Sequence, residues 1–196
     1  MSATDSQPQL AVTRPKRADA RRNYDKVIAA ARAAFTEGGA ETSLEGIARR
    51  AGVGIGTLYR NFPNRQALLE AVYVEEVQRL CGSVSALETL EPWEALSTWL
   101  RGLVAYMATK QALAAELMNY VERDAPVFMS CRATLYEAGG PLLDRAQAAG
   151  AVRKDTTIGE VIQLVGSIVK IQGATPEQIE HMLEITLDGL RRPARR

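Results

Sequence analysis

The segment from Thr42 to Arg65, TSLEGIARRAGVGIGTLYRNFPNR, constrains the fold more than any other part of this chain. It predicts two short helices joined by a tight turn at Gly52, because Gly adopts the left-handed backbone conformation at little steric cost. The second helix is expected from about 55 to 61, and Pro63 ends it. This helix offers polar side chains with almost no acid among them, which is typical of a helix-turn-helix.

Apolar residues recur at helical spacing along most of the remaining chain. The expected helices are about 21–36, 42–51, 55–61, 65–80, 92–107, 111–122, 126–149, 157–171 and 176–190, with residues 82–91 as a linker. Thr42 and Glu45 have capping-box spacing, and a bend is expected at Gly139–Pro141. Because no segment shows useful strand-like alternation, the sequence predicts an all-α fold of about nine helices.

Length and composition indicate a globular protein. The 196 residues suit one large domain or two small ones, and 46% are hydrophobic while 24% are charged. No apolar run reaches the roughly 18 residues of a membrane span, and the first twenty residues lack the apolar core of a signal peptide. We therefore expect a cytoplasmic protein without a membrane partner, in which Cys81 and Cys131 are reduced thiols, with a redox pair as the alternative.

Charge is distributed unevenly. Residues 14–65 hold 11 basic and 5 acidic residues, a net charge of +6, whereas residues 66–190 hold 9 basic and 17 acidic residues, a net charge of −8. This asymmetry suggests that only the N-terminal part meets a polyanion. The predicted organisation is a flexible basic arm (1–20), a helix-turn-helix domain (21–65, motif 43–62) and a C-terminal helical domain (66–196).

The second helix of the motif carries the chemistry needed to contact DNA. Arg60 can donate a bidentate pair to guanine, and Asn61 can pair with adenine or bond a phosphate. The hydroxyls of Thr57 and Tyr59 suit phosphates. Further contacts are expected at the helix start formed by Thr42 and Ser43, where free N–H groups favour phosphate, at the bare Gly54 and Gly56, and at Arg65 on the flank.

Two alternatives stay open at this point. The motif could be a three-helix packing unit with an Arg-rich surface, since look-alikes of this motif are common. The arm from Arg14 to Arg22 could lie in a minor groove or on the DNA backbone, or it could be a plain disordered tail.

The run from Ile47 to Val53, the run from Gly54 to Phe62, and the following Arg65 and Leu68–Leu69 resemble the DNA-binding domain of the TetR family of bacterial transcriptional regulators. The resemblance covers about residues 21–70. It implies a homodimer that binds a short palindromic operator in double-stranded DNA, usually as a repressor released by a small ligand. It also implies DNA contacts through Thr42, Ser43, Ile55, Gly56, Thr57, Tyr59, Arg60, Asn61 and Arg65. Because Ile55 and Gly56 are not polar here, direct base recognition must depend chiefly on Arg60 and Asn61.

Aromatic and Met residues concentrate in the middle of the chain. Such side chains suit an apolar cavity for a small-molecule effector, although ordinary core packing explains them as well. Glu116 and Arg132 could be polar contacts in such a cavity or could lie at the surface. The candidate pocket residues are Trp99, Leu103, Tyr106, Met107, Met118, Tyr120, Phe128, Met129 and Tyr136.

The last two helices carry more apolar surface than the other helices can cover. A two-fold contact between copies of the chain would cover it, and burial within the monomer is the alternative. Gly166 and Ser167 would allow close approach of helices, and His181 suits the interface or the surface better than a metal site. The candidate dimer residues are Ile158, Ile162, Val165, Val169, Ile179, Met182, Leu183 and Leu187.

Other functional classes fit the sequence poorly. With one histidine, no Ser/His/Asp set can be built well, and the Gly54–Gly56 pair follows no strand, so it fails the test for a dinucleotide site. We therefore expect no catalytic residues, no metal and no cofactor. A helical adaptor that only dimerises would show no salt-dependent affinity for DNA. An activator or an architectural DNA-binding protein would be indistinguishable from a repressor by sequence.

Overall fold

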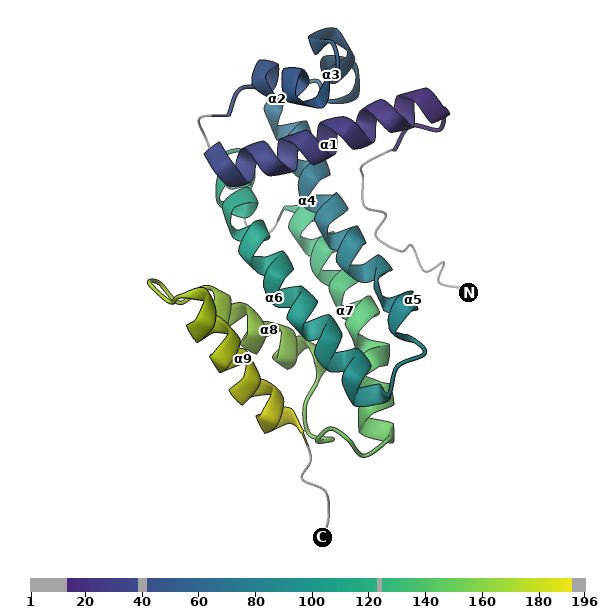
Figure 1. Ribbon diagram of the computed structural model, residues 1–196, viewed down its shortest axis with the longest axis vertical. Coiled ribbons are helices and arrows are strands. Elements are labelled where there is room, and N and C mark those ends of the chain that lie inside the picture. The colour runs from purple at the N-terminus through teal and green to yellow at the C-terminus, as the bar shows by residue number, and fades with distance from the viewer. Residues whose placement is uncertain (1–13, 39–41, 123–124, 192–196) are drawn as a thin grey trace, which may run out of the picture. The chain divides into compact units, whose positions relative to one another are not determined.

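The computed structural model describes residues 14–38, 42–122 and 125–191, and only the backbone of residues 108, 109 and 112. Within these residues the chain forms nine helices, and the one β-type pairing is an isolated antiparallel bridge between Val152 and Arg191. The all-α prediction is therefore confirmed. The helices in Figure 1 are α1 (Ala18–Gly38), α2 (Leu44–Ala51), α3 (Ile55–Asn61), α4 (Arg65–Gly82), α5 (Val84–Leu87), α6 (Pro92–Leu117), α7 (Pro126–Ala148), α8 (Ile158–Val169) and α9 (Pro176–Leu190).

The described residues group into two compact units. Unit 1 contains the residues up to Glu76 and those of 110–132, and unit 2 contains residues 77–109 and those from Ala133 onward. Helices α4, α6 and α7 contribute residues to both units. The predicted basic arm is described only from Arg14 onward, and the domain boundaries proposed from the sequence stay predictions.

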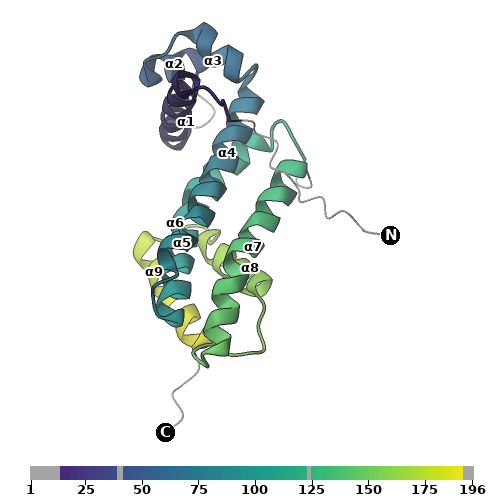
Figure 2. The same ribbon diagram turned by 90° about the vertical axis from the view of Figure 1, so that its right-hand side faces the viewer.

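Unit 1 is organised around the apolar stripe of α1. Tyr24, Val27 and Phe35 are almost fully buried, as the helical spacing predicts. Helices α2 and α3 both pack against α1 (Figure 2), and the ring centroids of Tyr24 and Phe62 lie 5.2 Å apart. Leu58 is the buried anchor of α3, so this short helix is held from one side and presents its other side to solvent.

Unit 2 has its own apolar core. Its members on α6 and α7 include Trp99 and Leu135, and α8 and α9 contribute Val165 and Leu183, all nearly inaccessible to solvent. Helices α8 and α9 form a hairpin whose two starts are closed by capping boxes, at Thr157 with Glu160 and at Thr175 with Gln178. These caps satisfy backbone N–H groups that the first turn of a helix leaves without partners.

The predicted cap of the second helix was wrong by one residue. Ser43 is the N-cap of α2, and its side chain accepts the backbone N–H of Gly46 at 3.0 Å. Thr42 instead donates its hydroxyl to the carbonyl of Ala34 at 2.9 Å. The Thr42–Glu45 pattern is therefore not used as a capping box, because a contact with α1 occupies the Thr42 side chain.

Two further expectations from the sequence were wrong. The segment 82–91 is not only a linker, since it contains the single turn α5. The guanidinium of Arg145 donates to the carbonyl of Leu87, the last residue of α5, and to those of Glu88 and Leu90 after it. Residues 92–107 and 111–117 form the one helix α6 rather than two, because the connecting residues include neither Gly nor Pro. Helix α7 runs through Pro141 without interruption, in agreement with the single helix expected over 126–149, and the bend expected at Gly139–Pro141 stays a prediction.

Candidate nucleic-acid interface

The turn between α2 and α3 is set by one glycine. Gly52 has φ 65° and ψ 34°, the left-handed region that Gly tolerates best. The backbone N–H of Gly52 donates to the Arg49 carbonyl at 3.2 Å, and that of Val53 donates to the Ala48 carbonyl at 3.0 Å. These bonds close the end of α2 and direct the chain into α3, which spans the residues expected from the sequence.

The outward face of α3 contains no acidic residue. Ile55 is 38% exposed and Tyr59 is 43% exposed, and Gly56 and Arg60 are exposed beside them. Ile55 and Tyr59 are four residues apart, as are Gly56 and Arg60, so the two pairs lie on the same side of the helix. The Arg60 guanidinium lies along the helix, with Nε donating to the Gly56 carbonyl at 3.1 Å and Nη2 donating to Thr57 Oγ1 at 3.4 Å.

The remaining predicted contacts around α3 differ in accessibility. Gly54 and Ser43 are exposed, whereas Thr57 and Asn61 are half-buried. The Asn61 side-chain amide donates to the Thr57 carbonyl at 2.8 Å, so part of its hydrogen-bonding capacity is used within the helix. Arg60 is consequently the most available of the predicted base-contacting side chains.

Two predicted phosphate contacts point into unit 1. Thr42 is half-buried and bonded to Ala34, and its own carbonyl accepts from Arg65 Nη1. Arg65 Nε and Nη2 also donate to Glu116 Oε1 at 3.0 and 2.9 Å. The Thr42 hydroxyl and three N–H groups of Arg65 are therefore bonded within the protein itself.

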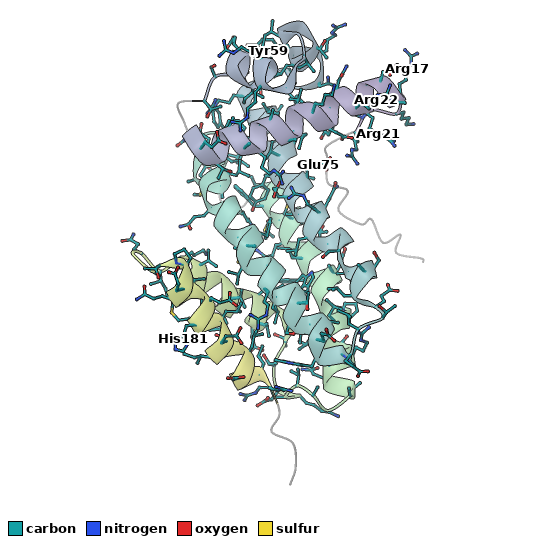
Figure 3. The ribbon with its side chains drawn as sticks, viewed as in Figure 1. Arg17, Arg21, Arg22, Tyr59, Glu75 and His181 are labelled. Atoms are coloured by element: carbon teal, nitrogen blue, oxygen red, sulfur yellow. The ribbon has the colours of Figure 1, made fainter. Side chains whose placement is uncertain are left out.

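Several further basic residues of unit 1 lie outside α3. Arg50 makes a bidentate pair with Glu37, at 2.6 and 2.8 Å, and this hydrogen bonding lowers the pKa of the Glu37 carboxyl. Arg14 pairs with Asp25 at 2.5 Å and with Glu75 at 3.6 Å. Figure 3 shows Arg17, Arg21 and Arg22 gathered at the N-terminal end of α1, and all three are exposed.

The candidate pocket residues divide between the two units. In unit 2, Trp99, Leu103 and Tyr106 are buried, and Met107 and Tyr136 are half-buried. In unit 1, Met118, Tyr120 and Met129 are 42%, 45% and 52% exposed, and Phe128 is half-buried with its ring 5.2 Å from that of Tyr73. A shallow surface depression in unit 1 is lined by residues 118–122.

Trp99 is packed tightly inside unit 2. A Cβ atom added at Gly139 of α7 would lie 2.6 Å from Trp99 Cη2 and 2.9 Å from Ile158 Cδ1. This glycine therefore allows α6, α7 and α8 to meet around the indole ring. Among the described residues, the buried indole Nε1 of Trp99 has no hydrogen-bond partner, which is uncommon for a buried polar group.

The candidate dimer residues are covered to different degrees within the protomer. Val165, Leu183 and Leu187 are buried in unit 2, as are Ile162 and Val169, whereas Ile158, Ile179 and Met182 are half-buried. Gly166 is also turned inward, because a Cβ atom there would lie 3.2 Å from Met107 Sδ. The outward apolar surface of this hairpin comes instead from residues that the site prediction did not include: Leu164 at 50%, Ile171 at 47% and Ile185 at 58% exposure.

Sequence reasoning missed the partner of Arg65. Glu116 is only 9% exposed as a whole residue and pairs with Arg65 across 51 positions of sequence, so no local pattern could reveal the contact. Asn64 was also missed as the N-cap of α4, where its side-chain oxygen accepts the Ala67 N–H at 2.8 Å. Its place directly before the helix is a usable signal for a cap.

Neither a metal centre nor a membrane span is found in the described part of the chain. No group of three or more His, Cys, Asp or Glu residues there could hold a metal ion. No helix there is long and apolar enough to cross a bilayer. Cys81 is a free thiol whose pKa burial raises to about 11, and Cys131 is a buried cysteine of α7.

Comparison with known proteins identifies the family. Residues 27–72 match the model of the bacterial regulatory proteins of the tetR family, and residues 91–192 match that of the C-terminal domain of SbtR-like transcriptional regulators. No curated protein matches the chain.

Solved structures agree with both matches. The TetR transcriptional regulator SCO0520 from Streptomyces coelicolor is 41% identical over 87% of this chain and 99% of its own, with a TM-score of 0.76. A TetR regulatory protein from Mycobacterium vanbaalenii is 34% identical over 91% of this chain and 100% of its own, with a TM-score of 0.75. SmeT from Stenotrophomonas maltophilia shares the fold alone, at 20% identity over 87% of this chain and 91% of its own and a TM-score of 0.58. The chain belongs to the TetR family of bacterial transcriptional regulators, whose members bind DNA through a helix-turn-helix.

Proposed function

We propose that this regulator acts in the cytoplasm as a homodimeric repressor, which binds a palindromic operator and is released by a small-molecule ligand. The observation that carries the proposal is the exposed, acid-free face of α3, with Tyr59 and Arg60 outward and Leu58 as its buried anchor. A rigidly anchored short helix with an outward guanidinium suits the major groove, where Arg pairs with guanine. Ser43, at the start of α2, can accept the Gly46 N–H and still donate its hydroxyl to a phosphate.

A homodimer is supported by the outward side of the α8–α9 hairpin. Leu164 and Ile185 are each at least half exposed in the protomer. Large apolar side chains exposed on two adjacent helices are a common mark of a protein–protein contact, and a two-fold contact of this hairpin with a second copy is the simplest way to cover them. Two copies would place two α3 helices on the two half-sites of a palindrome, roughly 34–36 Å apart.

A small ligand is supported by the environment of Trp99. Its buried indole N–H has no acceptor among the described residues, and the aliphatic Leu103 and aromatic Tyr106 are buried on the same helix. A ligand with an apolar body and an oxygen acceptor would satisfy that N–H. The fold relative SmeT is described as the repressor of a multidrug efflux pump, which is consistent with a repressor role here.

Selection of bound duplexes from a random DNA pool would test the proposal directly. We expect an enriched palindrome, a complex with two protomers by sedimentation, and affinity that falls as salt rises. A promoter reporter carrying that site should be silenced by the protein and restored by a ligand found by screening the complex. Asymmetric enriched sites bound by monomers would contradict the dimer, and reporter activation would contradict repression.

Trp99→Phe would test the ligand part separately. The substitution keeps an aromatic ring but removes the N–H, so the ligand should release the operator at a higher concentration while operator affinity stays at the wild-type level. Leu100→Met is a suitable control, because Leu100 is equally buried on the same helix and has no polar group to lose. Equal ligand response in the two variants would exclude Trp99 as a ligand contact.

A further inference from the structure

Arg65 occupies a site inside unit 1 that joins four helices. Its guanidinium carbon lies 5.0 Å from the centroid of the Phe35 ring on α1. Nη1 donates to the carbonyl of Thr42, which precedes the N-cap of α2. Nε and Nη2 donate to Glu116 Oε1 in the last turns of α6, at 3.0 and 2.9 Å. Arg65 itself begins α4.

The pair of Arg65 and Glu116 is sheltered from solvent. Their side chains are 18% and 10% exposed, and the second carboxylate oxygen of Glu116 accepts from the Asn119 amide at 3.4 Å. Removing one partner of such a pair leaves a desolvated charge without compensation, which is strongly unfavourable. Three of the five N–H donors of Arg65 are used by the Glu116 carboxylate and the Thr42 carbonyl, so turning the guanidinium toward a DNA phosphate would break these bonds.

We propose that Arg65 is a positioning residue rather than a phosphate contact. It holds the start of α2 through the Thr42 carbonyl, and Glu116 holds the guanidinium in the orientation that this bond requires. The Thr42 hydroxyl, bonded to Ala34, fixes the same point from α1. Operator affinity therefore depends on Glu116, a carboxylate of α6 that does not touch the DNA. The inference rests on the proposed operator binding and adds the residues that orient the helix-turn-helix.

The two roles of Arg65 predict opposite effects of Glu116→Gln. If Arg65 contacts phosphate, removal of the competing carboxylate frees the guanidinium and strengthens binding. If Arg65 positions α2, the neutral amide holds the guanidinium less well and binding weakens. Arg65→Lys separates the roles as well, because a phosphate contact tolerates lysine, whereas one ammonium cannot reproduce the fork that bonds Thr42 and Glu116 together.

The experiment measures affinity for the selected operator across a salt series for wild type, Arg65→Gln, Arg65→Lys, Glu116→Gln and the double Gln variant. We expect each single variant to bind at least tenfold more weakly. The double variant should bind no more than about threefold more weakly than the weaker single variant, because both changes remove the same interaction. The slope of log K against log salt should stay at the wild-type value, since no phosphate contact is lost.

Hydrogen exchange adds a readout that does not involve DNA. The amides at the start of α2, Glu45 to Ile47, should exchange faster in Glu116→Gln than in wild type, while those of α9 stay unchanged. The matched control is Arg101→Gln, which breaks an exposed pair with Glu180 and Glu184 in unit 2 and should leave operator affinity as in wild type.

Three results would overturn the inference: Glu116→Gln binding as tightly as wild type or more tightly, Arg65→Lys binding as tightly as wild type, or a slope reduced by about 0.9 in Arg65→Gln. If Arg65→Gln is unfolded by circular dichroism, the Lys and Glu116 variants decide the question alone. Failure of the wild-type protein to bind any duplex would instead refute the proposed function.

Discussion

The helix pairs α2–α3 and α8–α9 are built by similar local rules but present opposite surfaces. Each is joined by a turn that contains a glycine with positive φ, 65° at Gly52 and 76° at Gly173. Each begins at a hydroxyl N-cap, Ser43 in the first pair and Thr157 in the second. The outward face of α3 exposes Tyr59 and Arg60 and no acid, whereas α8–α9 exposes the large apolar side chains Leu164 and Ile185. Local sequence signals therefore determine where each helix pair starts and turns, and the exposed side chains determine what each pair can contact.

The difference between the two faces has a simple physical basis. A face with an exposed guanidinium and hydroxyls is well solvated and gains by meeting phosphates and base edges. Exposure of Leu164 and Ile185 to water is unfavourable, by about 25 cal/mol per Å² of apolar surface, until another apolar surface covers them. Substitutions that change the charge or polarity of either face test this explanation.

The largest effect is expected from a charge on the apolar face. Ile185→Glu should raise the dimer dissociation constant at least 100-fold, because a carboxylate without a partner would be desolvated at the proposed interface. Operator affinity should fall with it, since two linked DNA-binding helices act together. Sedimentation of the free protein and operator titration would measure both changes.

Burial in the structure determines which residue of α8–α9 can test the interface without unfolding the protomer. Val165 is one of the dimer candidates from sequence, but it is fully buried within the protomer, so a charge there would unfold unit 2 instead of separating two copies. Gln172→Glu adds the same charge at an exposed polar position between α8 and α9 and should remain dimeric. A dimeric Ile185→Glu protein would place the interface elsewhere.

A smaller effect is expected from loss of the outward guanidinium on α3. Arg60→Ala should cost about 1–3 kcal/mol at the selected operator and relax base choice at one position of each half-site. Titration of the operator and of its single-base variants would measure the loss and the position. The folding stability should change little, because Arg60 is exposed and bonds only to its own helix. An equal loss at every base variant would assign Arg60 to a phosphate instead.

Local sequence signals explain which of these features could be predicted. The bounds of α3 and α9 were predicted as found, because Gly or Pro stands at their ends. The features that were missed depend on distant residues. The turn α5 is bonded by Arg145, and the N-cap of α2 is at Ser43 because Thr42 is held by Ala34 and Arg65. The Arg65–Glu116 pair joins residues 51 positions apart, and no periodicity or motif spans that distance.

The shared turn glycines allow a matched test of the two pairs. Gly52→Ala and Gly173→Ala should each lower the free energy of unfolding by about 1–2 kcal/mol, because a Cβ atom is strained at positive φ. Neither added Cβ atom would meet another atom within 4 Å, so the backbone conformation alone sets the cost. Denaturant unfolding would measure it. Only Gly52→Ala should also weaken operator binding, since Gly52 sets the direction of α3; equal operator losses would mean that the two turns are coupled.

The smallest effects are expected at the helix caps. Ser43→Ala and Thr175→Ala each remove a side chain that accepts a first-turn N–H, so each should cost about 1 kcal/mol of unfolding free energy. The variants should differ in DNA binding. Ser43 is exposed, and its hydroxyl can donate to a phosphate, so Ser43→Ala should weaken binding to all duplexes alike.

Ser43→Gly serves as the control, because glycine is a tolerated cap that restores most of the stability but supplies no hydroxyl. If Ser43→Gly regains wild-type operator affinity, Ser43 acts on DNA only by starting α2; if it stays weak while its stability recovers, the hydroxyl itself contacts the duplex.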